Sequence, residues 1–314
     1  MPERPLHARR RHTRQAIVSA CVLLSGLAGL SGREALAAPP TLPPLLQPST
    51  TERHPGKVIL DQLVTPDLAT AERFYGGLFG WTFRALPDAK VPYATAWLRD
   101  RAVAGLYQRS VQSGEHGQSA WLTFFSATDV DAVKALAIQH GAHVLFGPRT
   151  IPDRGREAVL QDPQGAVFAV LASASGDPPD QAAGVGDWIW RSLITPDPDN
   201  DAAFYQTLLG DDVYDVTAAA ADPRHLILAA GGYARASVNA LPSSRPGAHP
   251  RWLNYIRVDD VAATSAKAAS LGGRILVQPR LDHSGTRIAV IADPLGAPLG
   301  LMEWSDTGSQ ADAK

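Results

Sequence analysis

The sequence LVTPDLATAERFYGGLFG at residues 63–80 returns as LITPDPDNDAAFYQTLLG at residues 193–210. Both copies keep a Thr-Pro-Asp triplet, a Phe-Tyr pair and a closing glycine, displaced by 130 positions throughout. In each copy the aspartate can cap a helix, apolar residues follow at helical spacing, and the glycine can end the helix. The chain is therefore predicted to contain a duplicated domain.

A second repeated motif closes each half. Asp162-Pro163-x-Gly165 and Asp293-Pro294-x-Gly296 are typical of tight hairpin turns, because proline presets φ and glycine tolerates positive φ. Each half divides again, since a strand followed by an Asp-capped helix is predicted at 57–80, 120–141, 187–210 and 251–272. Three short strands are expected after the first helix, at 81–86, 93–98 and 103–108. The predicted fold is α+β, built from four β-α-β-β-β units.

The repeats set the expected domain limits. The first domain is predicted at 57–172, a linker rich in Pro, Gly and Ser at 173–186, the second domain at 187–305, and a short tail at 306–314. The Pro-rich residues 38–56 are expected to form an extended tether.

The N-terminal residues 1–37 have the pattern of a secretory signal. Basic residues precede the apolar stretch 16–30, and Ala35-Leu36-Ala37 is a pattern that a signal peptidase accepts. We therefore expect an exported protein, periplasmic or secreted. Val18-Ser19-Ala20-Cys21 offers the alternative of a lipoprotein anchored at Cys21, although the apolar region then lies on the wrong side of the cysteine.

The composition excludes several function classes. The chain has 314 residues, of which 45% are hydrophobic and 19% charged, which is typical of a folded globular protein. Residues 1–37 carry a formal charge of +4 and the whole chain −2, so the rest carries −6 and offers no basic surface for nucleic acid. The apolar stretch is too short for a stable membrane span. Since Cys21 is the sole cysteine, the body of the chain forms no disulfide or thiolate metal site.

The four units, the helix signature and the closing D-P-x-G hairpin together resemble the vicinal oxygen chelate superfamily. This superfamily includes glyoxalase I, extradiol dioxygenases and bleomycin-resistance proteins. The resemblance extends over about residues 55–305. It implies that paired units curl their sheets into cups, where catalytic members commonly hold a divalent metal through His, Glu or Gln.

The positions that would carry those metal ligands have no donor groups here. The resemblance places ligands seven residues before each capping aspartate and four residues after each hairpin glycine. These six positions are Leu60, Leu122, Trp190, Leu253, Ala169 and Gly300. His140 and His143 are the closest histidine pair, and they straddle a predicted helix end. We therefore expect no metal and no cofactor.

Strand alternation predicts which side chains line the cups instead. The candidate ligand-binding residues are Gln62 and Phe124 in the first cup, and Trp190, Ser192, Tyr255, Arg257 and Met302 in the second. The second cup is expected to hold the better site, because Trp190 offers a stacking surface, Gly300 leaves space, and Arg257 with Ser192 can fix a polar group. A register shift of one residue would instead turn Asp61, Leu63, Arg191 and Leu193 inward.

Three functions are compatible with these residues. The first is an exported protein that binds a small, partly aromatic organic molecule in a metal-free cup, as a monomer or a homodimer. The second is an enzyme of the same superfamily, a lyase, isomerase or dioxygenase-like protein, acting through Gln62, Tyr255 or Arg257 or through relocated metal ligands. The third is a scaffold for a protein partner. The residues assign no catalytic group.

The signal sequence makes a testable prediction. The mature chain should begin near Ala38 and be found outside the cytoplasm, which mass spectrometry of the native protein measures. An N-terminus at acylated Cys21, or an intact Met1 in exported material, would contradict the predicted cleavage.

Overall fold

The four capping aspartates start four helices. In the computed structural model, which describes residues 42–87, 89–109, 118–220, 222–241, 249–282 and 284–304, Asp67, Asp129, Asp197 and Asp260 each accept backbone N–H hydrogen bonds at a helix start. The proposed signal, lipidation site and tail lie outside the described residues. No helix in the described ranges combines the length and apolar character that a membrane span requires.

The first domain consists of two β-α-β-β-β units, as predicted. Its elements are β1 (Val58–Thr65), α1 (Leu68–Phe79), β2 (Thr82–Ala85), β3 (Tyr93–Leu98), β4 (Arg101–Gln108), β5 (Ala120–Ser126), α2 (Val130–Gln139), β6 (His143–Ile151), β7 (Gly155–Gln161) and β8 (Val167–Ser173).

The second domain repeats this order. Its elements are β9 (Trp188–Thr195), α3 (Pro198–Leu209), β10 (Asp212–Asp215), β11 (His225–Ala230), β12 (Tyr233–Ala240), β13 (Arg251–Val258), α4 (Val261–Ser270), β14 (Arg274–Leu281), β15 (Arg287–Ala292) and β16 (Pro298–Glu303).

Each domain forms one mixed eight-stranded sheet. The strand order is β2-β3-β4-β1-β5-β8-β7-β6 in the first sheet, and β10-β11-β12-β9-β13-β16-β15-β14 in the second. The opening strands of the two units lie antiparallel at the sheet centre, β1 beside β5 and β9 beside β13. This pairing confirms the predicted α+β fold of tandem glyoxalase-like domains.

The register follows the first of the two alternatives considered. Leu63 and Leu193 are fully buried on the helix side of their sheets, in the two large core clusters. Leu60 and Phe124 pack together in a separate cluster on the opposite face of the first sheet. The cup faces therefore carry the residues that alternation predicts for them.

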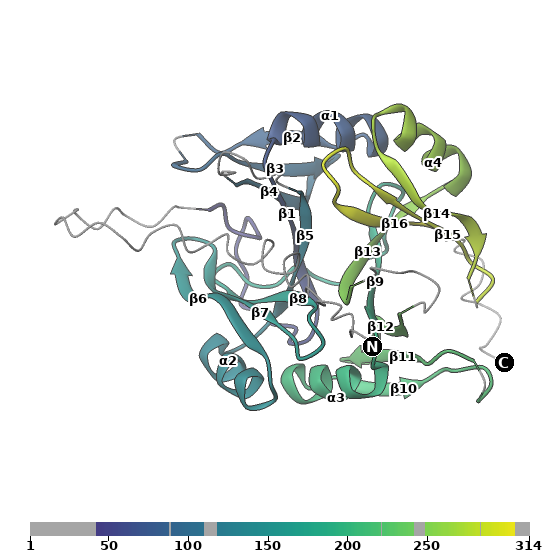
Figure 1. Cartoon of the computed structure of the whole chain (residues 1–314). Coiled ribbons are helices and arrows are strands. Elements are labelled where there is room, and N and C mark those ends of the chain that lie inside the picture. The colour runs from purple at the N-terminus through teal and green to yellow at the C-terminus, as the bar shows by residue number, and fades with distance from the viewer. Residues whose placement is uncertain are drawn as a thin grey trace, which may run out of the picture. The chain divides into compact units, whose positions relative to one another are not determined.

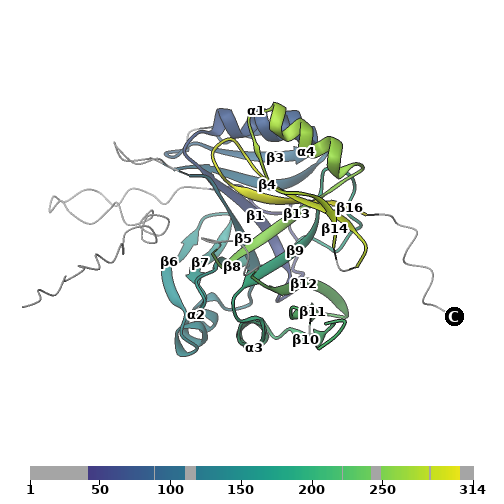
Figure 2. The same cartoon turned by 45° about the vertical axis from the view of Figure 1, so that its right-hand side comes forward.

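The helices pair between domains rather than within one. Figures 1 and 2 show α1 beside α4 and α2 beside α3, with the central strands β1, β5, β9 and β13 between the two helix pairs. One core cluster joins residues of the first and fourth units, and another joins the second and third. Each helix thus buries its apolar stripe partly against the other domain.

The two repeated motifs meet at these contacts. The Tyr75 hydroxyl from α1 donates to the Asp293 carboxylate in the second domain's closing hairpin at 3.1 Å, and Trp121 Nε1 donates to the same hydroxyl at 3.0 Å. Tyr75 and its counterpart in the second helix signature, Tyr205, are both fully buried. Burial and the neighbouring carboxylate raise the pKa of Tyr75 well above its ordinary value, so its hydroxyl stays a donor.

The second tyrosine forms the equivalent contact. The Tyr205 hydroxyl donates to Asp162 at 2.9 Å and accepts from Trp252 Nε1 at 2.9 Å. The other oxygen of Asp162 accepts the backbone N–H groups of its own hairpin. The aspartates therefore shape their turns and join the domains at the same time.

A buried polar cluster lies between the central strands. Asp61 forms an ion pair with Arg191, and its second oxygen accepts from Asn254 Nδ2 at 2.6 Å. Asn254 is also hydrogen-bonded to Thr123 at 2.8 and 3.1 Å. Because Asp61 is 1% exposed, burial raises its pKa while the Arg191 guanidinium opposes the rise.

The segment before β1 contacts the first domain, which corrects the expectation of a plain tether. Residues 42–47, here called the strap, lie across the first cup. Leu42 is 7% exposed and packs with Tyr93 and Ile151, and Leu45 packs against the cup cluster. Further along, the backbone N–H of Thr50 donates to the Ser175 carbonyl oxygen, and the backbone N–H of Asp177 donates to the Glu52 carbonyl oxygen. The Pro-rich composition gave no indication that this segment packs against the domain.

The interdomain hydrogen bonds make a prediction. Tyr75→Phe should lower the free energy of unfolding by about 1–3 kcal/mol, because it leaves the buried Asp293 oxygen and the Trp121 N–H without this partner. Urea unfolding measures the change. Tyr214→Phe, at a tyrosine that is 56% exposed, is the control. Equal stability of the two variants would contradict the role assigned to Tyr75.

Candidate functional site

The residues at the six positions where the superfamily holds metal ligands do lie together within each cup, but none of them carries a metal-binding group. In the first cup Leu60, Leu122 and Ala169 belong to one apolar cluster. In the second, Leu253 and Trp190 share a cluster and Gly300 lies beside Tyr255. Among the described residues no group of three His, Cys, Asp or Glu side chains could hold a metal ion. The residues at the superfamily's metal positions therefore do not fit a divalent metal.

Polar groups in the second cup form one hydrogen-bonded chain. Trp190 Nε1 donates to Ser237 Oγ at 3.0 Å, and Ser237 Oγ donates to Ser192 Oγ at 3.1 Å. Asn239 Nδ2 donates to Ser192 at 2.6 Å and to Ser237 at 3.0 Å. The structure thus brings Trp190 and Ser192 together as predicted. Ser237 and Asn239 follow the alternation of β12 but were not predicted, because the pairing register of that strand is set only in the folded sheet.

The apolar wall of the second cup contains Tyr255 and Met302, each 7% exposed. Leu253, Ile288 and Val290 complete it. A Cβ on Gly300 would lie 2.2 Å from the Tyr255 ring, so this ring occupies the space that the glycine was expected to leave for a ligand. Gly300 is needed for the close approach of Tyr255 to β16, and the predicted opening is corrected accordingly.

Arg257 has a different environment from the one expected. Its Nη1 donates to the carbonyl oxygen of Ala183 at 2.8 Å, and its backbone bonds Gly186 and Asp187. The side chain therefore holds residues 183–187 against β13. Strand alternation could not show that the linker folds back and contacts Arg257, which lies near the end of β13.

The first cup is more polar than the sequence indicated. Gln62 and Phe124 both face it, and Phe124 is 1% exposed inside the apolar cluster. Gly105 has no Cβ, and one built there would lie 2.2 Å from the Tyr93 hydroxyl and 3.4 Å from Gln62 Oε1. The glycine therefore lets the Tyr93 hydroxyl lie directly over β4.

Two buried charged residues from the β6–β7 hairpin add to this cup. Arg154 is 2% exposed, and its Nη2 donates to the Tyr93 hydroxyl at 2.9 Å. Glu157 is 8% exposed, and among the described residues no cation forms an ion pair with it. Burial raises the pKa of Glu157 to about 7, while Arg154 and Arg149 oppose the rise. Neither residue was predicted, because Arg154 lies in the turn before β7 and Glu157 on β7, both outside the two repeated motifs.

A cavity of about 930 Å³ opens beside the first cup. It extends from the strap and the rim residues Leu60 and Arg154 to the start of β9, where Trp190 reaches it. Its aromatic lining consists of Tyr93, Trp97, Trp188, Trp190 and Tyr233. Trp190 thus borders both the polar chain of the second cup and an open space.

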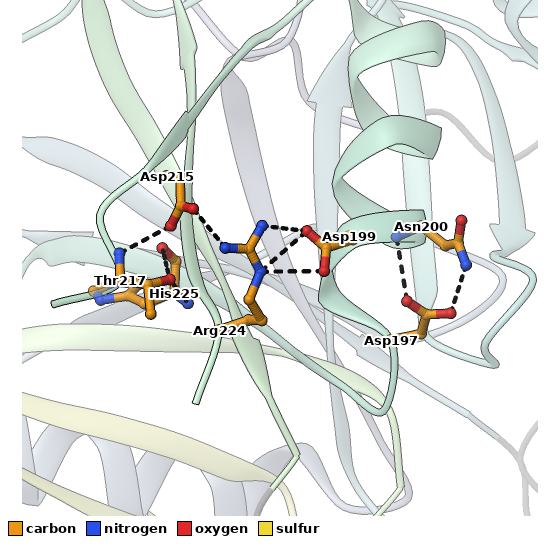
Figure 3. Close-up of polar contacts among 7 residues, drawn as sticks. All are labelled: Asp197, Asp199, Asn200, Asp215, Thr217, Arg224 and His225. Carbon is orange, nitrogen blue, oxygen red and sulfur yellow. Dashed lines mark hydrogen bonds and ion pairs between the residues drawn. The ribbon is translucent and has the colours of Figure 1, made fainter. Parts of the chain in front are cut away.

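An acidic cluster near α3 has a structural role. Figure 3 shows Arg224 between Asp199 and Asp215, with which it forms ion pairs, while Asp197 caps the helix through Asn200. The hydrogen bond from Thr217, and after it Arg224, lowers the pKa of Asp215 to about 2. These side chains tie the β10–β11 connection to the start of α3.

Comparison with protein families agrees with this geometry. Residues 57–170 match the Glyoxalase/Bleomycin resistance protein/Dioxygenase superfamily, and residues 191–302 match the Glyoxalase-like domain. The chain belongs to this superfamily, with one domain in each half.

Curated relatives match over nearly their whole length. A protein named "Putative glyoxylase CFP32" from Mycobacterium tuberculosis is 31% identical over 259 residues, covering 82% of this chain and 98% of the relative. The "Anthracycline biosynthesis protein DauV" from a Streptomyces species is 30% identical over 269 residues, covering 81% and 95%.

Solved structures support the fold. The Mn(II)-bound glyoxalase from Novosphingobium aromaticivorans has a TM-score of 0.54 at 18% identity, covering 80% of this chain and 83% of that one. The 2,3-dioxygenase LapB from Pseudomonas sp. KL28 has a TM-score of 0.56 at 12% identity, covering 81% and 94%.

The environment of Glu157 predicts a pH dependence. A carboxyl whose pKa is raised on folding contributes stability below its unfolded value of 4.5, and this contribution is lost as pH rises through about 7. Between pH 5 and 8 the stability of Glu157→Gln should rise relative to the native chain, on the order of 2–3 kcal/mol. Urea unfolding at a series of pH values tests this, with exposed Glu52→Gln as control. Parallel curves for Glu157→Gln and the native chain would contradict it.

Proposed function

We propose that this glyoxalase-superfamily protein binds a small organic molecule with an aromatic ring, and that it does so without a divalent metal. The observation that carries the proposal is the position of Trp190. Its indole Nε1 is held by Ser237, and its side chain lines a cavity of about 930 Å³. Such a ring offers a fixed stacking face with polar groups beside it.

The polar chain beside Trp190 supports recognition of a hydroxyl or carbonyl group. Ser192 and Ser237 are each 3% exposed, and Asn239 supplies a carbonyl oxygen as well as its N–H groups. Tyr255 and Met302 form the apolar wall of the same cup. A polycyclic aromatic ligand that stacks on Trp190 matches the aromatic lining of the cavity, and the name of the Streptomyces relative favours the same class.

The absence of donors at the six superfamily positions supports metal-free binding. Leu60, Leu122 and Ala169 in the first cup, and their counterparts in the second, supply no imidazole or carboxylate. We also propose that the mature protein is exported, from its N-terminal signal pattern.

A second candidate function is catalysis in the first cup. Glu157 favours it, because a buried carboxyl with a pKa of about 7 can exchange a proton with a substrate near neutral pH. Tyr107 shares this electrostatic environment, and burial raises its pKa as well. In that case Glu157, rather than Gln62, Tyr255 or Arg257, is the relocated acid–base residue of a superfamily enzyme.

Binding of an aromatic probe tests the first proposal. Isothermal titration of 1,8-dihydroxyanthraquinone should show binding that Trp190→Ala weakens by about tenfold or more, since an aromatic pair contributes ~0.5–1.5 kcal/mol in addition to its buried area. Trp304→Ala, at a tryptophan that is 50% exposed, is the matched control.

Two outcomes would contradict the proposal. Equal loss of affinity in the Trp190 and Trp304 variants would remove Trp190 from the site. Loss of binding after treatment with a chelator, with recovery on adding a divalent metal, would show that the binding depends on metal.

A further inference from the structure

The strap occupies the first cup as a bound molecule would. Leu42 packs with Tyr93 and Ile151, and Leu45 packs against the cluster that contains Phe124 and Leu171. The backbone N–H of Leu46 donates to Ser175 Oγ at 3.0 Å, which fixes the strap beyond the cup. Leu45 thus covers the apolar cluster of the cup, and Leu42 packs beside Tyr93.

Arg154 is only partly satisfied by this occupant. Its Nε donates to the Pro43 carbonyl oxygen at 2.9 Å and its Nη2 to Tyr93. Its Nη1 is buried and has no hydrogen-bond partner in the described ranges. A guanidinium fork matches a carboxylate, whereas the strap offers it a single neutral carbonyl.

The duplication provides an internal comparison. Glu157 pairs with Leu171 in the first sheet, and Ile288 pairs with Met302 at the same place in the second. The second cup therefore closes with apolar residues alone at this point, so the fold does not need a charge there. Burying Glu157 and Arg154 without an ion pair between them costs free energy, which indicates a role other than stability.

We propose that the first cup is a second ligand site, for a small organic carboxylate with an apolar body, and that the strap is its resident competitor. The carboxylate would replace the Pro43 carbonyl on Arg154 and satisfy Nη1. The apolar body would take the place of Leu45 beside Phe124 and of Leu42 beside Tyr93. Arg154 and Trp190 line the same cavity from different elements. The carboxylate needs Arg154 alone, so this site does not require a ring stacked on Trp190 or binding in the second cup.

Glu157 is compatible with an anionic ligand. Because burial raises its pKa to about 7, the carboxyl is largely uncharged at pH 6 and does not repel a carboxylate strongly. Arg149 lies opposite Glu157 in the β6–β7 ladder, and Tyr107 faces it from β4.

The test uses 2-naphthoate as the probe at pH 6, with neutral 2-naphthamide as the matched control ligand. Two full-chain variants displace the strap: the double substitution Leu42→Asp with Leu45→Asp, and deletion of residues 42–47. Removing a competitor raises the available fraction of sites, so both should bind 2-naphthoate about tenfold more tightly than the native chain. The gain for 2-naphthamide should be smaller.

Two further substitutions locate the binding. Arg154→Met, added to either strap variant, should abolish the gain, and Trp190→Ala should leave it intact. The proposal is overturned if neither strap variant binds 2-naphthoate more tightly, if the gain survives Arg154→Met, or if Trp190→Ala removes it. Ser175→Ala replaces a strap variant that does not fold, because it removes the Leu46 hydrogen bond and, besides that, a 3.4 Å contact with the Ser173 hydroxyl.

Discussion

The hydrogen bonds from Tyr75 to Asp293 and from Tyr205 to Asp162 hold the rest of the structure in place. Each bond joins the helix signature of one domain to the closing turn of the other. Neither tyrosine hydroxyl could be buried without its partner at acceptable cost, because an unsatisfied polar group in a core is strongly unfavourable. The helix faces of the two sheets therefore pack together in core clusters that both domains share.

Much of the fold could be predicted because its local signals agree with one another. Asp67 and Gly80 limit the first helix, and the same pattern recurs at 197–210. Alternation also gave the cup faces correctly from Leu60, Phe124 and Trp190. What alternation could not give was pairing between distant strands. Ser237, Asn239 and Glu157 enter the cups through registers that only the folded sheets define.

The site residues that were placed differently share a physical reason. The linker residues 183–187 contact Arg257, and the strap lies over the first cup. Both segments lack regular secondary structure and are held to a domain by a few hydrogen bonds each. Gly300 leaves no space for a ligand for a related reason, because the Tyr255 ring from the neighbouring strand lies over it. Composition shows that such segments are loops, but it does not show what they cover.

Asp61 and Arg191 occupy equivalent places in the two halves and form an ion pair with each other across the interface. In an assembly of two identical subunits, equivalent positions around a two-fold axis carry the same residue, and the pair would be two like charges. Opposite charges at this point need two halves of different sequence, which one polypeptide with a duplicated domain supplies. Gene fusion has thus made the halves non-interchangeable, and it leaves each cup able to change by mutation without altering the other.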